Sequence, residues 1–230
     1  GTDYQLLYNA PDLADVSLLR GDAGAQLRAL QPEIDRLTAS LRSVEGVRDV
    51  TWMVETVLPS FYLPGYGLKG VPLYLLGKSD SYVQNVYHEP EVGLSSDFSQ
   101  ILNRVREGGT ASSVPVSEFW RLSEGTPVLL GMDGDRRAID LPSAGTLGFL
   151  PGIPPRSVTD RQGYVQARVD YLNHLFSSNA YLVAGSDNPQ IAALQLLIPR
   201  VIVLVSTDGE HHGEAFQQAL VGASPELLVR

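Results

Sequence analysis

The chain contains no cysteine among its 230 residues. It therefore has no disulfide framework, no thiolate metal site and no cysteine nucleophile. Basic residues are also few, because 17 lysines and arginines stand against 26 acidic residues, for a formal net charge of −9. The only basic cluster is the short run DRR at residues 135–137, which cannot neutralise a phosphate backbone. These absences argue against nucleic acid as a partner.

Long hydrophobic runs are missing too. The longest, at residues 194–205, is interrupted by Pro199 and Arg200. It falls short of the roughly 20 apolar residues that a membrane-spanning helix needs. No charged segment followed by an apolar one opens the chain as a signal peptide would. Strand-like segments start and stop at the two edges of the sequence, so we expect an excised domain whose flanks were removed.

The sequence also lacks recognisable motifs for chemistry. No glycine-rich nucleotide-binding motif is present, and neither VSEF (116–119) nor AGSDN (184–188) has the G-x-S-x-G pattern of a serine nucleophile. The densest group of metal-ligand types, GEHHGE at 209–214, places His211 and His212 side by side, without the i, i+4 spacing of a zinc helix. His88 and His174 have no partner at a recognisable spacing. We expect no catalytic residue, no cofactor and no metal site, and therefore not an enzyme; a hydrolase of unfamiliar type is a minor alternative.

Both ends of the chain carry a strand–helix–strand pattern. At the start, an apolar stripe at helical spacing predicts a helix with Pro32 in its first turn and Gly46 just past its end. That stripe consists of Ile34, Leu37, Leu41 and Val44. Alternating residues at 3–8 and 47–58 predict strands before and after it. At the end, the same patterns predict a buried strand at 200–207, a helix containing Phe216 and Leu220, and a closing strand at 226–230.

Two such units commonly form one antiparallel sheet with both helices on one face. The predicted fold class is therefore α+β, with a ferredoxin-like subdomain formed by both chain ends, residues 1–75 plus 190–230. We expect Leu37, Leu41, Trp52, Val201, Val203 and Val205 in its core. Residues 76–189 would form a smaller, β-rich, distal subdomain inserted into it.

Residues 76–189 differ in composition from the two chain ends, because they contain many turn-forming residues. Helices are predicted within 95–109 and within 163–176, where apolar residues recur at helical spacing. Short strands are predicted at 114–116, 127–131, 137–141 and 145–150, separated by glycine, proline and aspartate. A helical turn bearing Phe119 and Trp120 would follow the first of these strands.

One aromatic stretch, residues 58–77, is a candidate contact surface. Phe61, Tyr62, Tyr66 and Tyr74 lie among glycines and prolines that exclude a long helix. If exposed, these rings would contact a partner or the membrane interface, where tyrosine is favoured. The alternative, which we weigh as the stronger one, is that the rings cover the joint between the two subdomains.

Four segments carry a resemblance to a known family. They are LRSVEGVRDVTW (41–52), LYLLGKSD (73–80), VPVSEFWRLSEGTPVLL (114–130) and RVIVLVSTDGEHHGEAFQQAL (200–220). In their order and spacing they resemble the large extracytoplasmic domain of ABC transporter permeases of the MacB/FtsX-like superfamily. Thr126 stands where that family usually has an aspartate. Residues 80–110 and 151–190 match none of its motifs.

The resemblance implies a function without catalysis. It implies a domain on the extracytoplasmic side of the cell membrane, joined at both ends to transmembrane helices of the same permease. A cytoplasmic ABC ATPase would act through those helices, and an extracytoplasmic protein or lipoprotein would contact the domain. We expect the isolated domain to be monomeric, with Asp3 and Arg230 on one face. The alternative is a free-standing extracytoplasmic module that binds a small ligand between its two subdomains.

Overall fold

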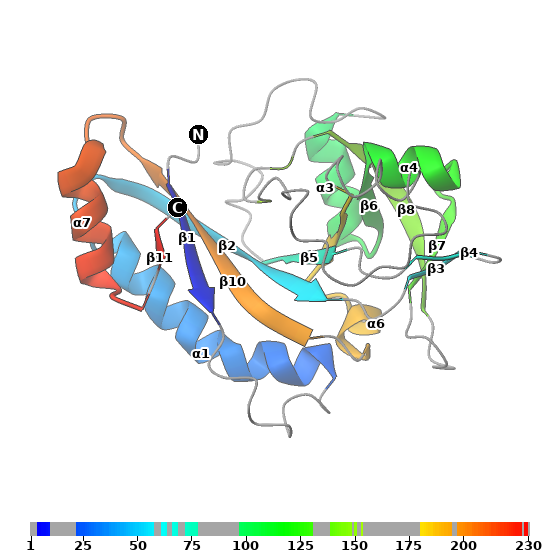
Figure 1. Ribbon diagram of the computed structural model, residues 1–230, viewed down its shortest axis with the longest axis horizontal. Coiled ribbons are helices and arrows are strands. Elements are labelled where there is room, and N and C mark those ends of the chain that lie inside the picture. Colours follow the sequence, from blue (N-terminus) through cyan, green and yellow to red (C-terminus); the bar gives the residue numbers. More distant parts are fainter. Residues whose placement is uncertain are drawn as a thin grey trace, which may run out of the picture.

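One sheet of eleven strands runs through the part of the chain that the structure, a computed structural model, describes (Figure 1). The described residues are 4–9, 22–57, 61–63, 66–68, 72–77, 97–130, 139–148, 150, 153, 180–194, 197–226 and 228–229. The strands are β1 (Tyr4–Asn9), β2 (Val47–Val57), β3 (Phe61–Leu63), β4 (Tyr66–Leu68), β5 (Pro72–Leu76), β6 (Thr110–Ser113), β7 (Pro127–Leu130), β8 (Ile139–Leu147), β9 (Leu182–Gly185), β10 (Leu197–Thr207) and β11 (Leu228–Val229). Their order in the sheet is β11-β1-β10-β2-β5-β9-β6-β8-β7-β3-β4.

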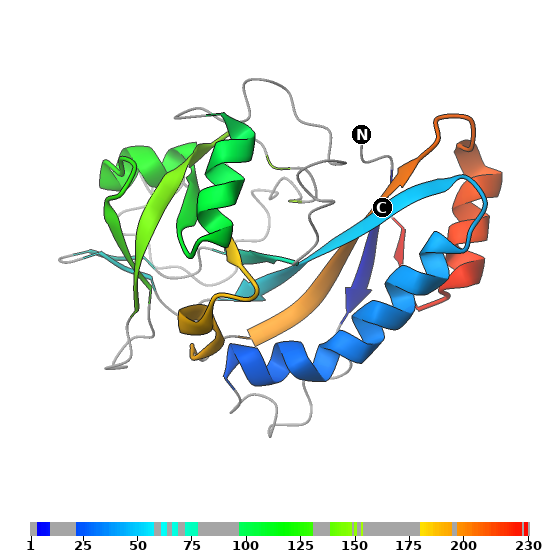
Figure 2. The ribbon, with the colours of Figure 1, turned by 180° about the vertical axis from the view of Figure 1, so that it is seen from behind.

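The two ends of the chain build one half of this sheet. β1 lies between β10 and β11, β10 pairs with β2, and all three pairings are antiparallel. Helices α1 (Ala23–Arg42) and α7 (Gly213–Ala223) pack on the same face of these strands (Figures 1 and 2). The predicted α+β class is confirmed, and the finer ferredoxin-like assignment stays a prediction.

Helix α1 begins earlier than its sequence pattern predicts. Asp22 caps the helix, its carboxylate accepting a 2.6 Å hydrogen bond from the backbone N–H of Ala25. Pro32 is therefore inside the helix and not in its first turn, so the carbonyl of Arg28 has no N–H four residues later to accept from. Burial of the apolar residues Ala23 and Leu27 on the sheet compensates for this missing bond.

The other half of the sheet mixes parallel and antiparallel pairs. β5 runs parallel to β9, and β6 parallel to β8, whereas the remaining neighbours are antiparallel. Helix α3 (Phe98–Arg106) packs on one face, and Val116 of helix α4 (Val114–Trp120) belongs to the core on the other. The short helix α6 (Pro189–Ala192) follows β9.

Two predictions for this half were wrong in detail, and a third is not tested. Residues 114–116 begin α4, because Pro115 needs no donor in a first helical turn. The strand expected there is β6, immediately before them. The two strands predicted at 137–141 and 145–150 are one strand, β8. The helix predicted within 163–176 lies outside the described residues.

The core has two layers, one on each face of the sheet. Along β10, Val201, Val203 and Val205 face α1 and α7, whereas Ile202 and Leu204 belong to the opposite layer. Leu37 and Leu41 are fully buried on the first face. The predicted core is thus confirmed for these five residues, while Trp52 is only partly buried at its rim.

No helix within the described ranges has the length and hydrophobicity needed to span a membrane.

Candidate functional site

The start of β1 and the end of β11 lie together at one end of the sheet. β11 runs antiparallel to β1, with Leu6 opposite Val229 and Leu7 opposite Leu228. A chain entering at β1 and leaving from β11 therefore passes the same end of the sheet (Figure 1). Asp3 and Arg230, the residues for which one common face was expected, lie just outside the described residues.

Two turns lie at this same end. Val47 and Thr207 are opposite each other, so the turn before β2 and the loop after β10 are neighbours. The backbone N–H of Asp208 donates to the carbonyl of Gly46 over 3.0 Å. Gly46 has φ +86°, and a Cβ there would lie 2.5 Å from the Cβ of His211. Only glycine therefore fits beneath the His211 side chain.

The GEHHGE segment is held by its own hydrogen bonds. The Asp208 carboxylate accepts from the backbone N–H groups of His211 and Glu210 and lies 2.8 Å from Nδ1 of His211. These bonds, the backbone one from His211 first, lower the pKa of Asp208. Among the described residues no three histidine or carboxylate side chains converge on one point that could hold a metal ion.

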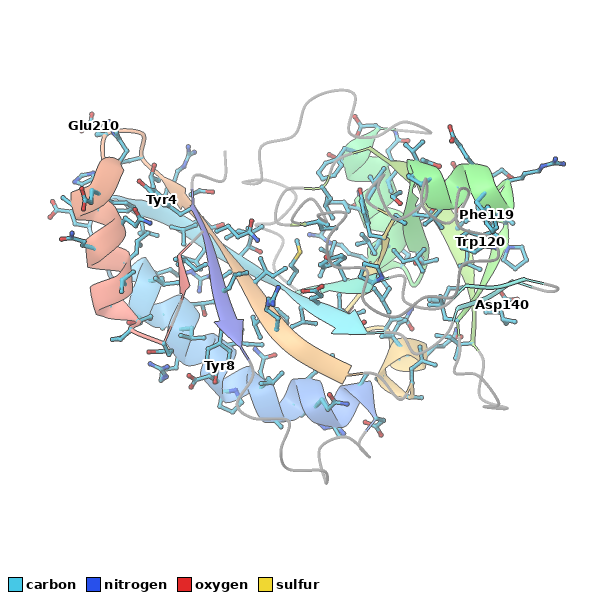
Figure 3. The ribbon with its side chains drawn as sticks, viewed as in Figure 1. Tyr4, Tyr8, Phe119, Trp120, Asp140 and Glu210 are labelled. Atoms are coloured by element: carbon cyan, nitrogen blue, oxygen red, sulfur yellow. The ribbon has the colours of Figure 1, made fainter. Side chains whose placement is uncertain are left out.

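Beside the sheet end, Tyr4 connects β1 to α7. Its hydroxyl accepts a 3.0 Å hydrogen bond from the backbone N–H of Gly213, and its ring lies 5.4 Å from that of Phe216 (Figure 3). The ring of His211 lies 6.0 Å from the same phenylalanine. The start of β1, the β10–α7 loop and α7 therefore form one packed unit.

A second group of contacts joins the two halves of the sheet. β2 pairs with β5, and β5 with β9, so the backbone ladder is continuous across the junction. On the helical face, the N–H of Ala23 donates to the carbonyl of Leu194 over 2.7 Å. The buried side chain of Gln26 accepts from the N–H of Ile198 over 3.2 Å. α1 is thus attached to the segment between α6 and β10.

A cleft of about 590 Å³ opens at this junction. One wall is a stripe of α1 that includes Arg28, Gln31 and Asp35, and the facing wall includes Asp187 in the turn after β9. Trp52 of β2 also lines the cleft. Sequence patterns did not predict this cleft, because its residues come from three segments that only the fold brings together.

The predicted aromatic residues do not all lie at a surface. Tyr74 is fully buried in the middle of β5 and makes an edge contact with Tyr181 at 6.3 Å between ring centroids. This position is a correction, because a strand with neighbours on both sides and a core on both faces exposes no ring to a partner. Phe61 and Tyr62 lie in β3 and Tyr66 in β4, the outermost hairpin of the sheet. Their backbone alone is described, so their role stays a prediction.

The two serines considered as nucleophiles differ in environment. Ser117 is buried, and its hydroxyl lies 2.7 Å from those of Ser112 and Thr146. This hydroxyl chain contains no base. Ser186 lines the junction cleft beside Asp187. The two described histidines, His211 and His212, lie at the end of the sheet that carries the chain ends.

Neither a family model nor a curated protein matches the chain in sequence. The solved structures that are similar to the chain include regions of MacB, of the ABC-type transporter YknZ and of a protein described as a permease. One is the periplasmic region of MacB from Actinobacillus actinomycetemcomitans, with a TM-score of 0.48 and 10% identity, covering 100% of this chain and 89% of that one.

Two further structures are of the same kind. The extracellular domain of the ABC-type transporter YknZ from Gram-positive bacteria has a TM-score of 0.43 and 13% identity, with 99% of this chain and 100% of that chain covered. A domain of a protein described as a permease from Porphyromonas gingivalis has a TM-score of 0.44 and 12% identity, with 99% and 86% covered. At such values the likeness assigns no activity to this chain.

Proposed function

We propose that this chain is the extracytoplasmic domain of an ABC transporter permease. Its function would be mechanical: movements of membrane helices, driven by a cytoplasmic ATPase, would pass through the domain to a partner outside. The family resemblance of the four sequence segments suggests this function. The observation that carries it is the antiparallel pairing of β1 with β11, which brings both chain connections to one end of the sheet.

This geometry suits a domain inserted between two membrane helices. Both helices must approach the domain from the same side, and adjacent antiparallel ends allow this without a crossing segment. Any shift of one helix relative to the other would act directly on β1 and β11. Because β1 also pairs with β10 along its whole length, and β10 with β2, the displacement would reach the neighbouring long strands.

Transmission also requires that the domain moves as a unit. The continuous β2–β5–β9 ladder and the hydrogen bond from Ala23 of α1 to Leu194, next to α6, attach the two halves on more than one element. We propose that residues 76–189 form the distal part, away from the membrane. In Figure 1 β1 and β11 lie in the same half of the molecule as α7, whereas α4, β7 and β3 lie towards the opposite end of the long axis. A protein or lipoprotein partner would contact this distal part, including the β3–β4 hairpin.

Side-specific labelling of the full-length protein tests the location. These 230 residues contain no cysteine, so Glu118→Cys, at an exposed position of α4, introduces the single thiol of this domain, and the unsubstituted protein gives the background labelling. A maleimide that cannot cross membranes should label it in intact spheroplasts. Leu41→Cys, which is fully buried, is the matched control and should stay unlabelled. Labelling of Glu118→Cys only after membrane rupture would place the domain on the other side and refute the proposal.

Transmission from β10 to α1 is tested separately. Gln26→Leu removes the acceptor for the N–H of Ile198 in β10, and we expect it to lower transport while ATP binding by the partner ATPase is kept. Gln218→Leu, on the exposed face of α7, is the matched control and should transport normally. Equal transport by both variants, at equal amounts in the membrane, would show that this bond carries no movement.

A further inference from the structure

The junction cleft has the features of a ligand site. Its volume of about 590 Å³ lies in the range of small-molecule pockets. Gly24, Arg28, Gln31 and Asp35 line it from α1, at the spacing that places residues along one side of a helix. Ser186 and Asp187 line it from the turn after β9. Figure 2 shows α1, β2 and α6 converging at this place.

Two glycines allow this shape. A Cβ at Gly77 would lie 2.7 Å from Cε2 of Trp52, so the indole rests directly on the backbone after β5. A Cβ at Gly24 would lie 3.0 Å from the Cβ of Ala192, so α1 and α6 approach closely at the edge of the cleft. The position of the aromatic ring is therefore set by backbone contact and not by a flexible neighbour.

The polar side chains of the cleft are available to a ligand. Within the described part of the chain, neither Arg28 nor Asp187 forms a side-chain hydrogen bond or an ion pair, and the Trp52 indole N–H donates to no residue. The side-chain amide of Gln31 donates to one carboxylate oxygen of Asp35 over 2.7 Å. The amide oxygen of Gln31 and the second carboxylate oxygen of Asp35 take no part in this bond. Donors and acceptors thus surround one aromatic ring.

This lining disfavours several ligand classes. Phosphate groups would meet two carboxylates, Asp35 and Asp187, against one cation, Arg28. An acyl chain would cover the polar groups of Arg28, Gln31 and Asp187 without forming hydrogen bonds with them. A metal ion needs converging ligands, and no such group is present among the described residues. An amine would gain from the ring and the carboxylates but would be repelled by Arg28.

We propose that the cleft binds a saccharide. A pyranose has an apolar C–H face that packs on an indole and neighbouring hydroxyl groups that both donate and accept hydrogen bonds. The planar carboxylate, amide and guanidinium groups of Asp187, Gln31 and Arg28 can each hold two such hydroxyls. A saccharide of this kind is neutral, so its binding does not require the site to carry a net charge of either sign. This inference does not depend on the transporter function.

Fluorescence of Trp52 gives a direct test. The chain has two tryptophans, so Trp120→Phe leaves Trp52 as the sole reporter. We would titrate this variant with cellobiose, lactose, maltose and N,N′-diacetylchitobiose. At least one should give a saturable change with a millimolar or lower Kd. In that background Asp187→Asn and Arg28→Gln should each weaken binding about 10-fold, the loss expected for one charge-assisted hydrogen bond.

Matched controls separate binding from folding. Asp140→Asn and Arg48→Gln change exposed residues outside the cleft and should bind like the parent (Figure 3 labels Asp140). Gly77→Ala should displace the indole and abolish binding while circular dichroism stays that of a folded protein. The proposal is overturned if none of the four sugars saturates the signal, or if the Asp187 and Arg28 variants bind like their controls. Saturation by putrescine in place of any sugar would show an amine site instead.

Discussion

Gly46→Ala should destabilise the domain far more than a backbone penalty alone predicts. Gly46 has φ +86°, and an L-residue in this region costs about 1–2 kcal/mol. The new methyl would also lie 2.5 Å from Cβ of His211, an atom next to the backbone that cannot rotate away. Overpacking of this kind costs about 1–3 kcal/mol more. We therefore expect a total loss of about 2–5 kcal/mol in the free energy of unfolding.

Gly209→Ala is the matched control for the backbone term. Gly209 has φ +87°, but a Cβ there meets nothing within 4 Å. Its substitution should cost only about 1–2 kcal/mol. Urea unfolding followed by tryptophan fluorescence and by circular dichroism measures both variants, and agreement of the two probes supports a two-state analysis.

A double-mutant cycle isolates the contact. With His211→Gly in place, Gly46→Ala should cost no more than Gly209→Ala, because the Cβ that the new methyl strikes has been removed. Equal losses for Gly46→Ala and Gly209→Ala in the parent background would refute the reasoning. It would mean that the β10–α7 loop moves aside freely and is not packed on the turn before β2.

Other predictions concern stability and assembly. Leu41→Ala, at a fully buried position, should cost about 2–5 kcal/mol in the same assay, and a loss below about 0.5 kcal/mol would contradict its burial. Glu33, hydrogen-bonded by Arg36, and Asp208 have lowered pKa values, so their contribution to stability is present above about pH 4 and is lost as pH falls through those lowered values. Glu33→Gln with Asp208→Asn should flatten this acid limb. Burial raises the pKa of the Tyr181 hydroxyl. The free energy of unfolding should therefore fall as the pH rises above about 10, and it should fall less in Tyr181→Phe. The isolated domain should sediment as a monomer at micromolar concentration, since its net charge of −9 opposes association; a tight dimer would be contrary evidence.

Sequence patterns predicted the elements whose two sides differ in polarity or whose apolar residues recur at a clear period. The amphipathic helix α3 and the long strand β10 are examples, because burial there follows side-chain spacing. Strands β6 (Thr110–Ser113) and β9 (Leu182–Gly185) were missed. All their residues are buried, and they are mostly small, so neither an alternation nor a bulky apolar run marks them.

The candidate sites were less predictable than the fold. The alternation of residues in β2 correctly predicts that Trp52 lies on the face of the sheet that α1 covers. That a cleft opens beside Trp52 depends on how α1 and α6 lie relative to each other, which the sequence does not show. Tyr74 was a candidate partner contact, because prolines and glycines surround it in sequence. Its burial follows from the pairing of β5 with β9, which begins more than a hundred residues later. Contacts over such separations leave no mark in local composition.

The position of β1 between β10 and β11 has a consequence for biosynthesis. Both of its hydrogen-bonding partners, β10 and β11, are made last, because Tyr4 pairs with Val205 and Leu6 with Val229. On the ribosome β1 therefore waits with two open edges until almost the whole chain has emerged. Closing so long a loop is entropically costly and slow. If membrane helices flank the domain, their prior association in the bilayer would hold the two ends near each other, and the membrane would act as a folding template for this sheet.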